Sequence, residues 1–240
     1  MDETDTPDDR PQEERRRTTG ARAMYERDAV EFSRATAFFD ATFALATTLL
    51  VTTLDPGPDG WSSWSALIDA VGNQLLAFGI SFAVVAGYWW LNHTFVSSLR
   101  GLSPRVIGGI VLEIAFIVLV PFTTEGMALG DVVPTVVYAV NVALVSLTAS
   151  LLYVLAWKQD LFLVPPERDE FLHDLRAGLI TPAVFLASVP VALLVSSNVA
   201  RWCWIALIPL NMAQGRADKR RAERAEAAGA GPGRGPGDDG

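Results

Sequence analysis

Four ionisable residues interrupt otherwise apolar stretches of this 240-residue chain. Arg34 and Asp40 lie in one stretch, His93 ends a second, and Glu113 lies within a third. Charged groups inside apolar segments are costly, so they usually pair with one another or serve a function. Brought together, they could lock helices in place, gate a pathway or relay protons, with His93 the group that titrates nearest neutral pH. The residue types alone leave these roles open.

The stretch around Asp40 also carries a stripe that mixes hydroxyl and apolar side chains. At about 100° per residue, helical geometry places five residues within an arc that is itself about 100° wide: Ala41, Leu45, Thr48, Leu49 and Thr52. A face directed at lipid has little use for hydroxyls, whereas small residues and threonine suit helix contacts or a pore lining. Simple helix packing, with each threonine bonded to its own backbone, is the alternative.

The sequence lacks the usual signatures of an enzyme. There is no Ser-His-Asp arrangement with plausible spacing and no phosphate-binding glycine loop. One cysteine, Cys203, cannot form an intrachain disulfide, nor build a zinc site with only two histidines. A net charge of −8 argues against a nucleic-acid partner. We therefore expect no catalytic activity, no metal site, no cofactor and no nucleic acid.

Six apolar segments must position these residues. Half of the chain is hydrophobic and its mean hydropathy is +0.29, and apolar runs of membrane length recur along it. The expected spans are 35–54, 66–92, 106–126, 132–157, 177–198 and 200–213. The last is short for a crossing. The pattern predicts an all-α membrane protein with six transmembrane helices per subunit, in contact with the lipid bilayer, rather than a soluble helical bundle.

Charged residues concentrate at the two ends of the chain. Residues 1–34 carry 17 and residues 214–240 carry 11, whereas the 179 residues between them carry only 18. The sequence therefore predicts three parts. These are a disordered cytoplasmic tail (1–28), a six-helix transmembrane domain (29–213) and a charged, Gly/Pro-rich cytoplasmic tail (214–240).

The basic residues indicate how the spans are oriented. Of the 19 lysines and arginines, 18 fall in segments on the side of the N-terminus, and only Arg201 falls on the other. This positive-inside bias places both termini in the cytoplasm of a multi-pass protein of the inner or plasma membrane. The outer loops are acidic, and Asp55 and Asp59 follow directly after the first span. Such charges would concentrate cations at an outer mouth.

Three motifs resemble the transmembrane protein 175 family, potassium channels of lysosomes with prokaryotic relatives. Arg34-x-x-x-Phe38-Phe39-Asp40 is similar to the Arg-x-x-x-Phe-Ser-Asp signature that opens each repeat of the family. Trp90-Leu-Asn-His93-Thr-Phe95 resembles the motif at the end of the family's second helix. Leu119-Val-Pro121-Phe122-Thr-Thr resembles the motif near the end of its third. Phe39 departs from the family's serine, which removes a hydroxyl from the expected polar network.

The resemblance implies a prokaryotic single-repeat channel, a homotetramer whose first helices line a central pore for K⁺. By position, Leu45 would be the constricting residue and Thr48 would influence selectivity, with Leu49 and Thr52 lining the next layers. The network behind the pore helix would comprise Arg34, Asp40, Trp90 and His93, and we expect Glu113 to join it.

The function predicted from these features is a potassium-permeable cation channel with a hydrophobic constriction. The sequence contains no Thr-Val-Gly-Tyr-Gly-like loop for a filter of backbone carbonyls. Two alternatives stay open. Asp40, His93 and Glu113 could serve a proton-conducting or proton-coupled transport protein. The threonine-containing stripe could instead be only the oligomer interface of a non-conducting membrane scaffold.

Overall fold

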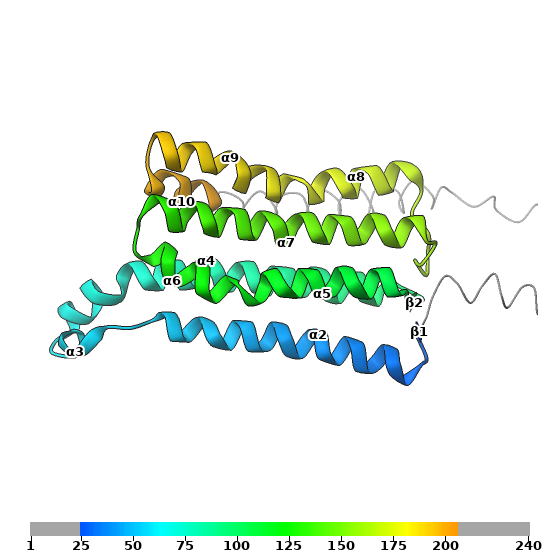
Figure 1. Ribbon diagram of the computed structural model, residues 1–240, viewed down its shortest axis with the longest axis horizontal. Helices are drawn as coiled ribbons and strands as arrows, with labels where there is room; N and C mark the ends of the chain where they lie inside the picture. The colour runs from blue at the N-terminus through cyan, green and yellow to red at the C-terminus, as the bar shows by residue number, and fades with distance from the viewer. Residues whose placement is uncertain (1–24, 206–240) are drawn as a thin grey trace, which may run out of the picture.

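The computed structural model describes residues 25–205, which form a bundle of long helices with aligned axes (Figure 1). In chain order the helices are α2 (Val30–Leu49), the 3₁₀ turn η1 (Leu50–Thr53), α3 (Gly57–Gly60), α4 (Trp64–Ser97), α5 (Pro104–Val118), α6 (Val120–Ala128), α7 (Val132–Lys158), α8 (Arg168–Gly178), α9 (Ile180–Leu194) and α10 (Ser197–Ile205). Strands β1 (Tyr25–Glu26) and β2 (Gly101–Leu102) pair antiparallel.

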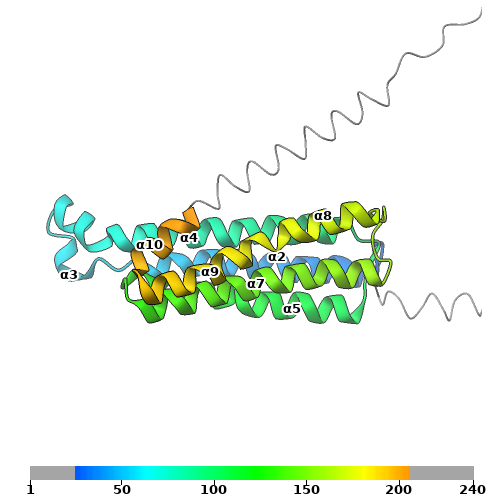
Figure 2. The same ribbon diagram turned by 90° about the horizontal axis from the view of Figure 1, so that it is seen from above.

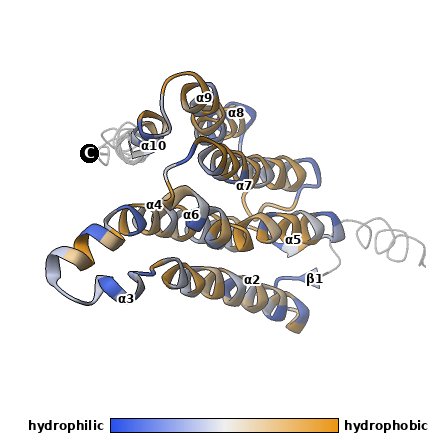
Figure 3. Ribbon diagram, turned by 60° about the vertical axis from the view of Figure 1, so that its left-hand side comes forward, coloured by the Kyte–Doolittle hydropathy of each residue, from blue (hydrophilic) through white to orange (hydrophobic). Residues whose placement is uncertain are grey.

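Five helical stretches are long and apolar enough to cross a membrane. They are Val30–Thr53, Trp64–Ser97, Pro104–Ala128, Val132–Lys158 and Arg168–Leu194. Coloured by hydropathy, their middles are apolar, whereas α3 and the β1 region are polar (Figure 3). The first five predicted spans are thus confirmed as helices. Of the predicted sixth span, 200–213, the structure describes only the part in α10. Residues 206–213, the C-terminal tail and most of the N-terminal tail lie outside the described residues.

One helix was not expected from the sequence. The segment before the fifth span reads as a charged loop, yet residues Arg168–Gly178 form α8. Two of its acidic residues, Asp169 and Glu170, lie in the first turn and Arg176 lies in the last, which suits the helix dipole. Phe171 is buried and stacks on Trp157 of α7, with ring centroids 4.4 Å apart. The Tyr153 hydroxyl of α7 donates to Asp174 Oδ2 of α8 at 2.9 Å, so an aromatic contact and a hydrogen bond attach this polar helix to the bundle.

Proline explains why the third span is divided into two helices. Pro121 lies at the start of α6 and has no backbone N–H, so the ladder of backbone hydrogen bonds of α5 is interrupted near Leu119.

Side-chain caps mark the first residues of two helices, α4 and α5. The Ser63 hydroxyl accepts from the Ala66 amide at 3.1 Å, and the Ser103 hydroxyl accepts from the Val106 amide at 3.3 Å.

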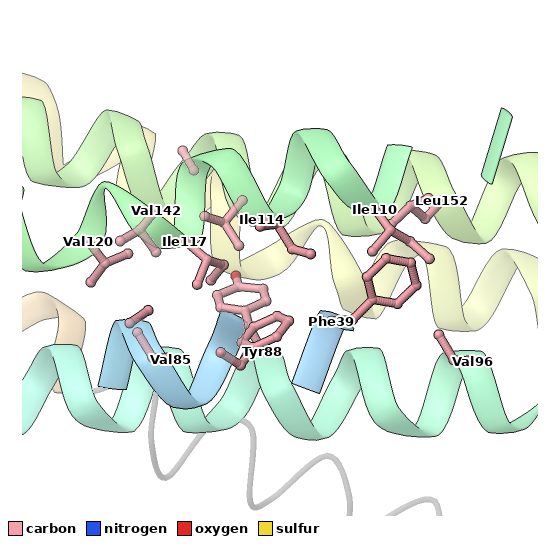
Figure 4. Packing of buried hydrophobic residues seen from close by; sticks show 14 of the residues in the cluster. Phe39, Val85, Tyr88, Val96, Ile110, Ile114, Ile117, Val120, Val142 and Leu152 are labelled. Carbon is pink, nitrogen blue, oxygen red and sulfur yellow. The ribbon is translucent and has the colours of Figure 1, made fainter. Parts of the chain in front are cut away.

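The core lies where α5 and α7 meet. α7 packs against α9 on one side and α5 on the other, while α2 packs against α4 and α5. Figure 4 shows Phe39 of α2 together with Ile110 of α5 and Leu152 of α7, all of them buried. Tyr88 of α4 points toward the helix that carries Ile117 (Figure 4). The first span is thus fixed to the bundle along one face.

Hydrogen bonds join three segments at the end of the bundle that carries β1, here called the β1 end, and form a small clasp. The segments are the one before α2, the α4–α5 connection and the α7–α8 connection. Tyr25 pairs with Leu102, and the Arg100 amide donates to the Leu161 carbonyl at 2.9 Å. The Arg27 guanidinium donates to the carbonyl oxygens of Ser97 (2.6 Å) and Leu99 (3.2 Å). Residues 25–28, the described part of the predicted N-terminal tail, thus attach the start of α2 to the α4–α5 and α7–α8 connections.

Candidate pore-lining face and intramembrane polar groups

The two faces of α2 differ sharply within one subunit. Phe39, Phe43 and Ala46 are buried on the face toward the bundle. The predicted stripe is on the exposed face, with 58% of Leu45 and 39% of Leu49 accessible. Ala41, Thr48 and Thr52 are exposed as well. The residues singled out by helical spacing therefore lie on a face of a membrane-spanning helix that the subunit itself does not cover.

The threonine hydroxyls of this face are bonded to their own backbone. Thr48 Oγ1 donates to the Ala44 carbonyl at 2.9 Å, and Thr52 Oγ1 donates to the Leu49 carbonyl at 2.7 Å. Each hydroxyl proton is thereby used, while the oxygen keeps lone pairs that can accept. Thr52 belongs to η1 rather than to α2. The tighter 3₁₀ turn rotates it away from the ideal α-helical arc, and it stays exposed.

Asp40 is hydrogen-bonded to a tryptophan outside the predicted polar network. Trp89 Nε1 donates to Asp40 Oδ1 at 3.0 Å, which joins α4 to α2. The Trp89 and His93 rings stack with centroids 5.6 Å apart, and Trp90 stacks on His93 at 6.3 Å. The predicted residues Trp90 and His93 thus lie beside the Asp40 contact, and Trp89 makes it.

Glu113 has a separate partner. It is only 1% exposed, and Asn92 Nδ2 donates to its Oε2 at 3.2 Å. Within residues 25–205, the exposed Arg34 side chain makes no hydrogen bond or ion pair with Asp40 or Glu113. The predicted set is therefore divided into an Asp40 group and a Glu113 pair, with Arg34 in neither.

The partner of Glu113 could have been found from the spacing along α4. Its buried residues recur every three or four positions: Ala77, Ser81, Val85, Tyr88, Asn92 and Val96. This period places Asn92 on the inner face and the neighbouring His93 on the outer one. The family motif drew attention to Trp90 and His93, whereas the inward-facing asparagine was missed.

Buried hydroxyl groups connect α4 with α6 and α7. Tyr88 and Ser146 share a hydrogen bond, and Ser81 donates to the Tyr138 hydroxyl at 3.1 Å. Thr124 Oγ1 donates to Ser81 Oγ at 2.7 Å. Such pairs satisfy polar groups that lipid cannot, and they hold transmembrane helices together.

The predicted outer-mouth acids lie at the opposite end from β1, where α3 projects beyond the bundle (Figure 1, Figure 2). Asp55 Oδ1 accepts from the Gly57 amide at 2.9 Å, in a turn where Gly57 has a φ of +64°. The Asp55 backbone also forms two hydrogen bonds with the Gln74 side chain. Asp59 is exposed within α3. Asp55 therefore shapes the loop as well as contributing charge.

Metal ligands do not converge within the part of the chain that the structure describes: no group of three His, Cys, Asp or Glu residues there could hold an ion. Long apolar helices with satisfied polar groups inside them define a multi-pass helical membrane protein.

Comparison with known proteins shows which membrane proteins the chain resembles. Residues 34–121 match the family model described as the endosomal/lysosomal potassium channel TMEM175. No curated protein matches the chain. The resemblance drawn from the three motifs is confirmed, and all three lie within or at the edge of the matched segment. The family members are ion channels and not enzymes, as the sequence predicted for this chain.

Two solved structures share the fold. A lysosomal potassium-selective channel TMEM175 homologue from Chamaesiphon minutus superposes with a TM-score of 0.65 at 21% identity, covering 77% of this chain and 97% of the homologue. A threonine-to-alanine variant of the potassium channel MtTMEM175, solved with a nanobody–MBP fusion, gives a TM-score of 0.52 at 18% identity. That match covers 78% of this chain and 93% of the variant.

Proposed function

We propose that the protein is a potassium-permeable cation channel, a homotetramer in which four copies of α2 surround a central pore. The observation that supports this most strongly is the exposed stripe on α2, which combines leucines with threonine hydroxyls in a membrane-spanning helix. A closed rotational assembly would bring one such stripe from each subunit to a common axis. The similarity to TMEM175 potassium channels supports the same assignment.

In this proposal Leu45 forms the constriction. Four leucine side chains facing one another make a narrow apolar ring, which excludes hydrated ions and can close by dewetting. Potassium loses its hydration shell at a lower cost than sodium, so a ring of this kind favours potassium. Thr48 lies about 4.5 Å further along the axis. There its hydroxyl oxygen can coordinate a partly dehydrated cation. Leu49 and Thr52 line the following layers.

The polar contact behind α2 sets the rotation of the helix. Asp40 is held by Trp89 on one side of α2, and Phe39 and Phe43 pack into the bundle on another. Two independent contacts of this kind fix which residues point away from the subunit. The polar group thus supports the pore without contributing to its surface.

Orientation and partners follow from the charges. The β1 end carries Arg27, Arg100, Arg105, Lys158 and Arg168, so we assign it to the cytoplasm. The protein would reside in the inner or plasma membrane, with other copies of itself and the lipid bilayer as its partners. Potassium is the permeant ion, and the proposal needs no resident cofactor.

Thr48→Ala is expected to lower the potassium-to-sodium permeability ratio about threefold, a change of about 0.7 kcal/mol in relative barrier height. The measurement is ion flux through the purified full chain in liposomes. Thr47→Ala is a matched control, since Thr47 makes the same kind of backbone bond, to Phe43 at 2.8 Å, but is partly buried. An unchanged ratio in Thr48→Ala would remove Thr48 from the selectivity mechanism.

The same liposome assay on the wild type separates the alternative functions. Proton flux without potassium flux would favour the proton-transport alternative. A stable tetramer that conducts neither ion would favour the non-conducting scaffold.

The acidic outer end should matter only at low ionic strength. Asp55→Asn combined with Asp59→Asn is expected to lower inward cation current about twofold at about 10 mM salt and to have no effect at about 1 M, where the Debye length is only about 3 Å. Asparagine keeps the oxygen that accepts from the Gly57 amide, so the turn is preserved. Asp169→Asn, at the opposite end, serves as the control. A current that is equally reduced at both salt concentrations would contradict the electrostatic explanation.

A further inference from the structure

Glu113 is a buried carboxyl group that the proposed pore does not use. It lies in the middle of α5 on the face turned into the subunit, with Ile110, Ile114 and Ile117 on the same face. Its one hydrogen bond within the described residues comes from the Asn92 amide, and Asn92 is itself buried. The carboxyl group is thus isolated inside a single subunit.

No cation faces Glu113 from the described helices packed around it. The buried residues of α2 are apolar, and the titratable group that interacts electrostatically with Glu113 is the Tyr88 phenol of α4. Other ionisable side chains on these helices are exposed or partly exposed: Glu31, Arg34, Asp69, His93, Arg105, Glu125 and Lys158. Three further groups already have hydrogen-bond partners: Asp40 with Trp89, Tyr138 with Ser81, and Tyr153 with Asp174. The described part of the chain offers Glu113 no counter-ion.

This environment accommodates a carboxylic acid far better than a carboxylate. A buried charge with a single neutral donor keeps most of its desolvation cost. The neutral acid needs only the Asn92 amide as a donor to its carbonyl oxygen, and its own O–H is a further donor. The observed hydrogen bond is compatible with this form.

We propose that Glu113 is a proton-binding site inside each subunit, and that release of its proton loosens the contact between α4 and α5 and lowers cation conduction. The conduction part rests on the proposed channel function, whereas the proton site does not. The site lies within the helix bundle and is distinct from the stripe on α2.

A single turn of α4 connects this site to the pore helix. Asn92, which binds Glu113 on α5, is three residues from Trp89, which binds Asp40 on α2. The two positions differ by about 4.5 Å along the helix axis. A displacement of this turn, caused by a new charge on Glu113, would therefore act on the Asp40 contact that orients α2.

Infrared spectroscopy of the purified full chain tests the proton site directly. A protonated carboxylic acid has a carbonyl stretch well separated from that of a carboxylate. We expect such a band at neutral pH in the wild type, its loss at alkaline pH, and its absence in Glu113→Gln. Glu113→Asp should shift the band rather than remove it, and Glu125→Gln, at an exposed glutamate, should leave it unchanged. A wild-type spectrum without the band would overturn the site.

Thermal unfolding gives an independent readout. If the folded state holds one proton more than the unfolded chain, stability falls as pH rises. The Tm of the wild type and of Glu125→Gln should fall by about 3 °C per pH unit between about pH 5 and pH 7, where the unfolded chain has lost the proton and the folded state still holds it. Glu113→Gln should lack this contribution. An equal dependence in all three proteins would contradict the proposal.

Potassium flux separates the site from its coupling to the pore. We expect flux through the wild type to fall at least about threefold as pH is raised over the range in which the band disappears, and flux through Glu113→Gln to stay constant. A titrating band with no pH effect on flux would overturn the coupling and leave the site standing. A protein that conducts no potassium at any pH would overturn the channel proposal, while the spectra still decide on the proton site.

Discussion

Replacing Leu45 with alanine is expected to raise potassium flux about tenfold and to reduce selectivity over sodium. Four copies of the residue would form the narrowest layer of the pore, so the substitution removes four isobutyl groups from one ring. A constriction that is wider and has less apolar surface holds water more readily. The free-energy barrier to the passage of a hydrated ion is therefore lower. A decrease of about 1.4 kcal/mol in that barrier corresponds to the tenfold change. Flux from potassium-loaded liposomes measures it.

A second leucine provides the control for this experiment. Leu151 on α7 is 47% exposed, comparable with the 58% of Leu45, but it lies on a different helix. Leu151→Ala should leave flux and selectivity at their wild-type values. If Leu45→Ala and Leu151→Ala behave alike, Leu45 is not the constriction and the proposed pore axis is wrong.

Phe43→Ala is expected to be the most destabilising substitution on α2. Phe43 is 2% exposed and lies between Phe39 and Ala46 on the face that attaches α2 to the bundle. Truncation of a buried phenylalanine leaves a cavity and costs about 3 kcal/mol. In a lipid environment the loss is mainly one of van der Waals packing, since the bilayer is as apolar as the core. The Tm of the purified protein should fall by roughly 10 °C.

The matched substitution for Phe43 is Phe122→Ala on α6. Phe122 is 70% exposed in the subunit, so its removal leaves no internal cavity. Its effect on Tm should be within about 3 °C. Similar losses for the two variants would show that the buried face of α2 does not fix this helix to the bundle.

The sequence predicted the helices that depend on apolar length alone. The first five spans are continuous apolar runs, and each corresponds to a helix or a pair of helices in the structure. The α8 helix was missed because it is polar, and its contacts with α7 come from the buried Phe171 and from Asp174, which accepts a hydrogen bond from Tyr153. The β1–β2 clasp was missed because its bonds join backbone groups far apart in the sequence, and no side-chain pattern records them.

The candidate site was predictable to the level of a helix face, but not to the level of individual partners. Helical spacing was sufficient to place Leu45, Thr48 and Leu49 together on the exposed side of α2. The polar contacts depend on how α4 is rotated against its neighbours, and this rotation is set by packing. Trp89 and Asn92 consequently make the contacts to Asp40 and Glu113, each one position before a residue of the predicted motif.

The most direct test of the channel proposal is the symmetry of the assembled protein and the helix that lies on its axis. Electron cryomicroscopy of the full chain in lipid nanodiscs would show both. The proposal predicts a fourfold assembly in which α2 surrounds the axis, with Leu45 at the narrowest point and Thr48 directly beyond it. A monomer, or an oligomer with another helix at its axis, would contradict it.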